Sequence, residues 1–242
     1  MVITVPNVSD ASVGSPHPLD SATWSSLTGA HARFALGRGL ARRYEPALSP
    51  FAAVADVDDE RAWRDLHDVY AEGEVAALSG APGFSRAVHE GWELDGVVAG
   101  VQLVSTDALR SAPADDAFVL GAVDAVEAMD LVARTEPGPF RPRTYELGTY
   151  LGLRRDGRLV ALAGERLHPT GWTEISAVCT DPAYRRQGLA STLVSAVADL
   201  VRSRGEVPFL HTSAANTRAI DLYLAMGFEL RCEVEFATFR AT

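Results

Sequence analysis

The spacing of hydrophobic residues divides the second half of the chain into alternating strands and helices. The run 172–180 is short, apolar and rich in β-branched residues, and it predicts a strand. Apolar residues then recur at helical spacing from Leu189 to Val201, and Gly205 stands where that helix should stop. A second apolar run of strand length follows at 208–213. These segments predict a strand, a helix and a second strand of a mixed α/β fold.

The first half has a less regular pattern. Residues 58–71 predict a helix, because an Asp can cap its start and apolar side chains repeat on one face. Residues 92–104 are typical of a strand, within which Gly96 and Gly100 indicate turns or bulges. Residues 24–44 fit a helix or a pair of helical turns. This half therefore mixes helices and strands.

Between the two halves, 111–116 has the composition of a linker. The next segments predict a strand at 118–120 and a helix at 122–134, with Val123, Val126 and Leu131 facing inward.

Two further strands, 150–154 and 159–165, should pair around Asp156-Gly157, a strong type I′ turn signal.

The resulting domain prediction has three parts. Residues 1–20 form a flexible tail, 21–110 an N-terminal α/β lobe, and 116–242 the domain that carries the recognisable motifs. The N-terminal lobe could be an eroded copy of the same fold.

Composition narrows the class of function. The chain has 242 residues and a net charge of −10, with a pI near 5.0. Broad electrostatic binding to nucleic acid needs a basic face, so no nucleic-acid partner is expected, whereas a cationic substrate would be favoured. Cys179 and Cys232 are too few for a disulfide framework and lack zinc-ligand spacing. With no basic leader and no apolar run of membrane length, we expect a cytoplasmic protein that contacts no membrane.

The junction 181–190 offers a site for a pyrophosphate. The first N–H groups of a helix have no partner inside it and, with the helix dipole, attract an anion. Gly188 and Ala190 let phosphate oxygens approach the main chain, while Arg185 and Arg186 supply positive charge. The loop has neither a Walker ending nor a three-glycine dinucleotide fingerprint.

This loop resembles the Arg/Gln-x-x-Gly-x-Gly/Ala coenzyme A loop of the GNAT superfamily of N-acyltransferases. The family's next block also follows in order, as Asn216, then Ala219-Ile220-Asp221-Leu222-Tyr223, then Gly227-Phe228. The similarity covers residues 118–242, and 145–152 resembles the lead-in of a subgroup with an extra N-terminal lobe.

The resemblance implies a GNAT fold and direct transfer of an acetyl group from acetyl-CoA to a primary amine in a ternary complex, without metal. It implies that the strand edge and the loop hold the cofactor, that Asn216 holds its pantetheine arm, and that Tyr223 protonates the leaving thiolate. The strand and loop residues are Val178, Cys179, Thr180, Arg185, Arg186, Gln187, Gly188, Leu189, Ala190 and Ser191. Asn216 could equally cap a helix, and Tyr223 could simply pack inside one.

Two residues compete to be the general base. Glu174 lies eleven positions before Arg185, where the histone-acetylating branch of the superfamily has its glutamate. His211 lies five positions before Asn216, where the branch acting on ribosomal protein N-termini has a glutamate instead. An unperturbed imidazole has a pKa near ~6.5 and accepts a proton at neutral pH, whereas a glutamate near ~4.3 needs burial or a water relay. We favour Glu174.

Other functions stay open at this point. The loop could serve a non-catalytic acyl-CoA sensor or interaction module, although the presence of both Glu174 and Tyr223 argues against it. Transfer to a hydroxyl, or of a longer acyl group, is also compatible with these residues. The sequence identifies neither the acceptor amine nor a choice between monomer and homodimer.

Overall fold

The computed structural model describes residues 17–242. The helices are α1 (Ala22–Thr28), α2 (Glu60–His67), α3 (Ala125–Thr135), α4 (Leu189–Ser203) and α5 (Thr217–Met226). The strands are β1 (Ala35–Leu36), β2 (Ala41–Tyr44), β3 (Ala52–Val54), β4 (Val75–Gly80), β5 (Trp92–Ser105), β6 (Phe118–Val119), β7 (Tyr150–Arg155), β8 (Arg158–Glu165), β9 (Trp172–Thr180), β10 (Val207–Ser213) and β11 (Phe228–Ala241).

Eight strands form one mixed sheet in the order β4-β11-β5-β10-β9-β8-β7-β6. Only β9 and β10 are parallel neighbours, and every other described pair in this sheet is antiparallel. The parallel pair needs a crossover, which α4 supplies. Strands β1 to β3 form a separate small sheet. The predicted mixed α/β fold is confirmed.

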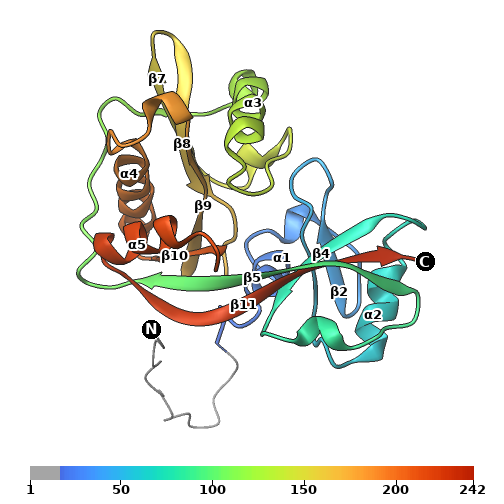
Figure 1. The fold of residues 1–242 in the computed structure, drawn as a ribbon. Helices are drawn as coiled ribbons and strands as arrows, with labels where there is room; N and C mark the ends of the chain where they lie inside the picture. The colour runs from blue at the N-terminus through green and yellow to red at the C-terminus, as the bar shows by residue number, and fades with distance from the viewer. Residues whose placement is uncertain (1–16) are drawn as a thin grey trace.

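Two long strands tie the molecule together. In Figure 1, β5 and β11 run side by side along the base of both lobes. Strand β5 comes from the first half of the chain, yet it lies between β10 and β11 of the second half. The end of β11 in turn pairs with β4 of the first half. Strands from the two predicted domains therefore pair with each other at two places in one sheet. This is possible because long antiparallel strands pair irrespective of their separation in sequence.

The core around β7, β8 and β9 has two layers, one on each face of the sheet. Alternate residues of β8 face opposite sides of the sheet, so that Ala161 and Ala163 pack with α4, while Leu162 packs with α3. Figure 1 shows α3 and α4 flanking β7 to β9. The Asp156-Gly157 turn has the two positive φ values, 50° and 77°, that a type I′ turn requires, which confirms the predicted hairpin.

The helix predicted at 122–134 buries a different face from the one that the sequence pattern predicts. Val123 and Val126 were predicted to face inward, but they are 93% and 74% exposed. The α-helix begins only at Ala125, after a 3-10 turn, and this changes which positions fall on the buried side. That side consists of Ala125, Ala128, Leu131 and Val132.

The N-terminal half differs more from prediction. Strand β5 is continuous, with a bulge beside Gly96, while Gly100 leaves room for the Phe236 ring: a Cβ there would lie 2.5 Å from it. Residues 24–44 contain the end of α1 and a 3-10 turn at Ala32–Phe34, which match the predicted pair of helical turns, and then a β hairpin that was not predicted. Of the predicted tail, residues 1–16 lie outside the described part, and Leu19 is buried.

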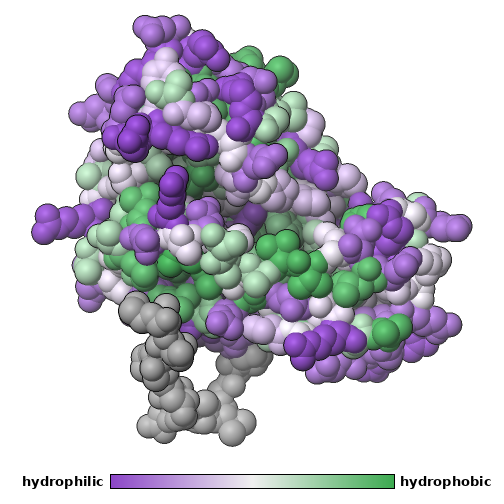
Figure 2. Space-filling view, viewed as in Figure 1, coloured by the Kyte–Doolittle hydropathy of each residue, from purple (hydrophilic) through white to green (hydrophobic). Residues whose placement is uncertain are grey.

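Figure 2 shows apolar residues gathered across the front of the molecule at the level of β5 and β11. The large exposed apolar side chains of these two strands are Leu94, Val97, Val98 and Leu230. Within residues 17–242, the structure contains no helix with the length and apolar character needed to span a membrane.

Candidate active site

The loop 181–190 is held by its own side chains and by unusual backbone conformations. The Asp181 carboxylate accepts a hydrogen bond from the Ala183 N–H at 3.0 Å and caps a 3-10 turn. Arg186 and Gly188 have left-handed φ values of 64° and 78°. Gly188 is the N-cap of α4, so the partnerless N–H groups of the first helical turn begin at the loop.

Strands β9 and β10 separate soon after they begin. Their last paired residues are Glu174 and Phe209. Beyond them, β10 pairs with β5, whereas β9 pairs with β8. Ala177, with a φ of 54°, lies at a shift in the β8–β9 register, where a bulge redirects the backbone. The segment 178–180 therefore presents one edge to the space between the diverging strands.

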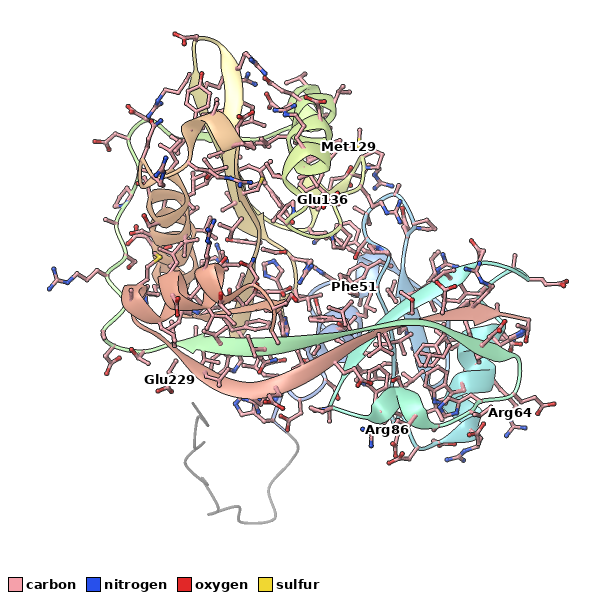
Figure 3. The ribbon with its side chains drawn as sticks, viewed as in Figure 1. Phe51, Arg64, Arg86, Met129, Glu136 and Glu229 are labelled. Atoms are coloured by element: carbon pink, nitrogen blue, oxygen red, sulfur yellow. The ribbon has the colours of Figure 1, made fainter. Side chains whose placement is uncertain are left out.

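A cleft of about 610 Å³ occupies this space and reaches the start of α4. We call it the loop cleft. Every residue predicted to hold a cofactor except Gln187 lines it, namely Val178, Cys179, Thr180, Arg185, Arg186, Gly188, Leu189, Ala190, Ser191, Asn216 and Tyr223. The sequence reasoning missed its other lining residues, which are Thr135, Glu136, Pro137, Tyr184, Arg218, Ala219 and Leu222. Figure 3 shows Glu136 where α3 ends.

Two residues of the α5 region combine structural and site positions. The Asn216 side chain accepts a hydrogen bond from the Ala219 N–H at 3.3 Å, so it caps α5 while it also lines the loop cleft. Tyr223 is 7% exposed, packs with Phe228, and lines the same cleft. Burial raises the pKa of Tyr223 to about 12, so the phenol keeps its proton at neutral pH.

Glu174 is fully buried. Its two carboxylate oxygens accept hydrogen bonds from Arg166, one from Nε at 2.8 Å and one from Nη2 at 2.5 Å. Burial alone would raise the pKa of this carboxyl, but the Arg166 charge and the hydrogen bonds outweigh it and lower the pKa to about 2. In Figure 3, Phe51 marks the junction of the two lobes, and the Arg166 guanidinium lies 4.9 Å from its ring. Glu174 does not line the loop cleft.

His211 connects Glu174 to a second cleft. Its Nδ1 lies 2.8 Å from a Glu174 oxygen, and its Nε2 lies 2.9 Å from the Gln102 amide nitrogen. The contact with Glu174 joins the last paired residue of β9 to a residue of β10 two positions beyond Phe209. The His211 side chain is 5% exposed. The structure therefore brings the two predicted base candidates into one hydrogen-bonded pair.

The second cleft, of about 590 Å³, lies over β10, β5 and β11. We call it the His211 cleft. Its wall is formed by the segment before α1, by the end of β4 and by β11. Its polar and charged lining residues include Asp20, Gln102, His211, Arg231 and Glu233.

Sequence reasoning missed Gln102, Arg166 and Arg231. Gln102 is the one of the three with a local signal, because it is a polar residue inside the apolar run 101–104 and is only 1% exposed. Arg166 directly follows β8 and Arg231 lies within β11, both in segments whose charges are typical of a solvated surface.

Comparison with known proteins identifies the family. The model of the FR47-like protein family matches residues 150–237. A crystal structure of a GNAT-family protein from Novosphingobium aromaticivorans DSM 12444 is 34% identical, with a TM-score of 0.85, over 93% of this chain and 99% of that one. The chain belongs to the GNAT family. That relative shares the fold of this chain over both of its halves.

Two other relatives differ in what they match. A GCN5-related N-acetyltransferase from Kribbella flavida is 18% identical over 91% of this chain and 95% of that one, with a TM-score of 0.62, and supports the GNAT fold alone. N-alpha-acetyltransferase RimI from Mycobacterium tuberculosis (strain ATCC 25618 / H37Rv) is 35% identical over 83 residues. Those residues make up 33% of this chain. The chain spans about half the length of this curated relative.

Proposed function

We propose that this GNAT protein transfers the acetyl group of acetyl-CoA to a primary amine by direct attack in a ternary complex. The observation that carries the proposal is the loop cleft, where the predicted cofactor residues meet at the start of α4 and along the open edge of β9. Arg185 and Arg186 supply charge for the pyrophosphate, and the first amides of α4 supply hydrogen bonds. The strand edge 178–180 can pair with the amide groups of the pantetheine arm.

The acceptor amine is proposed to enter from the His211 cleft. Asp20 and Glu233 contribute negative charge there, which suits an ammonium group, although Asp20 is paired with Arg231. His211 lines this cleft and lies two positions beyond Phe209, where β9 and β10 diverge. The class of acceptor is thus a primary amine on a small molecule, a peptide or a protein.

His211 is the better candidate for the general base. Glu174 is fully buried, is held by Arg166 and has a pKa of about 2, so it is a poor proton acceptor for a substrate. In the proposed reaction, His211 Nε2 takes a proton from the amine, whose N–H replaces that of Gln102. The neutral amine nitrogen then bonds to the acetyl carbon and releases its remaining surplus proton to solvent as the carbon–sulfur bond breaks. Tyr223 gives its proton to the leaving thiolate and regains one from solvent. Glu174 is a positioning residue in this scheme.

A thiol-release assay with a panel of primary amines tests the function directly. We expect release of free coenzyme A that depends on an amine and yields an N-acetylated product by mass spectrometry. Binding of acetyl-CoA without release of thiol for any amine would instead support the acyl-CoA sensor. A product acetylated on oxygen would move the acceptor class to hydroxyls.

Gly188→Val should weaken acetyl-CoA binding by about 2 kcal/mol, roughly 30-fold in Kd, measured by calorimetry. A branched side chain would obstruct the approach of the pyrophosphate to the main chain and would be strained at a φ of 78°. Gly205→Val is a matched control, because Gly205 ends the same helix with a φ of 77° and open space around its Cβ position. The control should bind acetyl-CoA like the wild type; unchanged affinity in Gly188→Val would refute the assigned cofactor site.

Tyr223→Phe should keep cofactor affinity and lower kcat by about 10²-fold, because it removes only the proposed proton donor. The matched control is Tyr70→Phe, which alters another buried phenol in the other lobe whose pKa is also raised to about 12. Steady-state kinetics and thermal unfolding of both variants are compared. If Tyr223→Phe loses stability while kcat stays constant, Tyr223 only packs inside α5.

A further inference from the structure

Gln102 is a buried amide whose orientation is fixed by its neighbours. It lies in β5 and is 1% exposed. Its Oε1 accepts a hydrogen bond from Arg231 Nη1 at 2.8 Å. Its Nε2 lies 3.1 Å from the Leu19 carbonyl oxygen and 2.9 Å from His211 Nε2. Arg231 is itself paired with Asp20.

These contacts allow one orientation of the amide. A guanidinium can only donate and a carbonyl oxygen can only accept, so Gln102 must present its oxygen to Arg231 and its NH₂ to Leu19. A flipped amide would oppose donor to donor and acceptor to acceptor at these two contacts. The second N–H of Gln102 is thereby directed at His211 Nε2, which has to accept it.

The proton of the imidazole then belongs on its other nitrogen. His211 Nδ1 lies 2.8 Å from Glu174, whose ionised carboxylate can only accept. We propose that Gln102, oriented by Arg231, is a positioning residue that keeps His211 uncharged, with its proton on Nδ1 and a lone pair on Nε2, until an amine takes the place of the amide. The use of this lone pair as a base rests on the proposed function, whereas the protonation state rests on the contacts alone.

The charges around His211 show why the amide matters. Glu174 favours a positively charged imidazole, while Arg166 on the far side of that carboxylate and Arg231 near the amide disfavour it. Asp20 partly offsets Arg231. Protonation of Nε2 would direct its new N–H against the N–H of the amide, so the amide adds a short-range penalty that the surrounding charges do not supply.

A long-range proton–nitrogen-15 correlation spectrum of the full-length wild-type protein tests the protonation state without any ligand. Of the six histidines, His211 is assigned by the signal that disappears in His211→Gln. At neutral pH we expect one protonated nitrogen, Nδ1, and one bare nitrogen, Nε2. A doubly protonated ring, or a proton on Nε2, would overturn the proposal without the need for any further variant.

Two substitutions test the role of the amide. Gln102→Leu removes the N–H without adding charge, so His211 should become protonated at a pH about one unit higher than in the wild type. The acid limb of kcat/KM should move in the same direction, and raising the pH should restore activity. Arg231→Met should change the pH at which His211 becomes protonated by less than Gln102→Leu does. Without the Arg231 guanidinium the Gln102 amide is still present but can rotate away from His211. Glu229→Gln, on an exposed residue at the start of β11 two positions before Arg231, is the control and should leave the titration unchanged.

The outcomes separate this proposal from the proposed function. If His211 has the expected protonation and Gln102→Leu shifts it, but kcat does not respond to His211→Gln, the amide positions a histidine that is not the base. If Gln102→Leu folds and leaves the titration of His211 unchanged, Gln102 has no positioning role, whatever the activity.

Discussion

His211→Gln should lower kcat by about 10²- to 10⁴-fold at neutral pH, the range expected when a general base is removed. The amine acceptor arrives largely protonated, so attack on the thioester requires a group that removes a proton. Affinity for acetyl-CoA should stay that of the wild type, because His211 does not line the loop cleft. The acid limb of the pH profile should disappear with the side chain. Steady-state kinetics across pH, with calorimetry of cofactor binding, measure both effects.

His67→Gln is the matched control for this substitution. His67 ends α2 in the other lobe, so its replacement should leave kcat and the pH profile unchanged. Retention of the acid limb in His211→Gln, together with its loss in Glu174→Gln, would return the role of base to Glu174. Retention in both variants would mean that the amine arrives neutral or that another group accepts the proton.

Glu174→Gln should lower the free energy of unfolding by about 3 to 5 kcal/mol, because it leaves the Arg166 charge buried without its partner. Arg166 is 11% exposed at its side chain, so water cannot replace the lost carboxylate. Denaturant titration at neutral pH gives the difference from the wild type. The matched control is Glu45→Gln, because the side chains of Glu45 and its partner Arg143 are 36% and 41% exposed and can be solvated. Loss of the ion pair in the control should lower the free energy of unfolding by about 1 kcal/mol or less.

The stability difference between wild type and Glu174→Gln should itself depend on pH. The pKa of Glu174 is about 2 in the folded protein against an ordinary value of 4.5, so the unfolded chain binds this proton more readily. The stabilisation from the ionised carboxylate is therefore complete above about pH 4.5 and is lost as the pH falls towards 2. The glutamine variant has no such component, so the difference should shrink over that interval. A constant difference would contradict the ion pair as its source.

Local signals in the sequence were sufficient where a short segment determines its own conformation. The type I′ turn at Asp156-Gly157, the helix from Leu189 and the N-cap at Asn216 follow from residues within a few positions of each other. The loop 181–190 could be assigned for the same reason, since a strand, a loop and a helix start are contiguous. Val123 and Val126 were misplaced because a 3-10 turn changed the helical phase, which the pattern of apolar residues does not reveal.

The pairing of β5 with both β10 and β11 could not be predicted, because it joins segments more than a hundred residues apart. The same separation hid the contact of His211 with Gln102, which joins β10 to β5. The contacts of Glu174 with His211 and Arg166 join shorter separations but depend on how β9 packs beside β10 and the end of β8.

The sequence by itself determined the mixed α/β class, and it indicated the loop 181–190 as the candidate cofactor loop and two candidates for the base, since each depends on residues close together in the chain. Only the tertiary structure decided that Glu174 and His211 form one pair, that Arg166 lowers the pKa of Glu174, and that Gln102 faces His211. The physical reason is that burial and electrostatic environment arise from packing between distant segments, and they determine whether a carboxylate or an imidazole can take a proton.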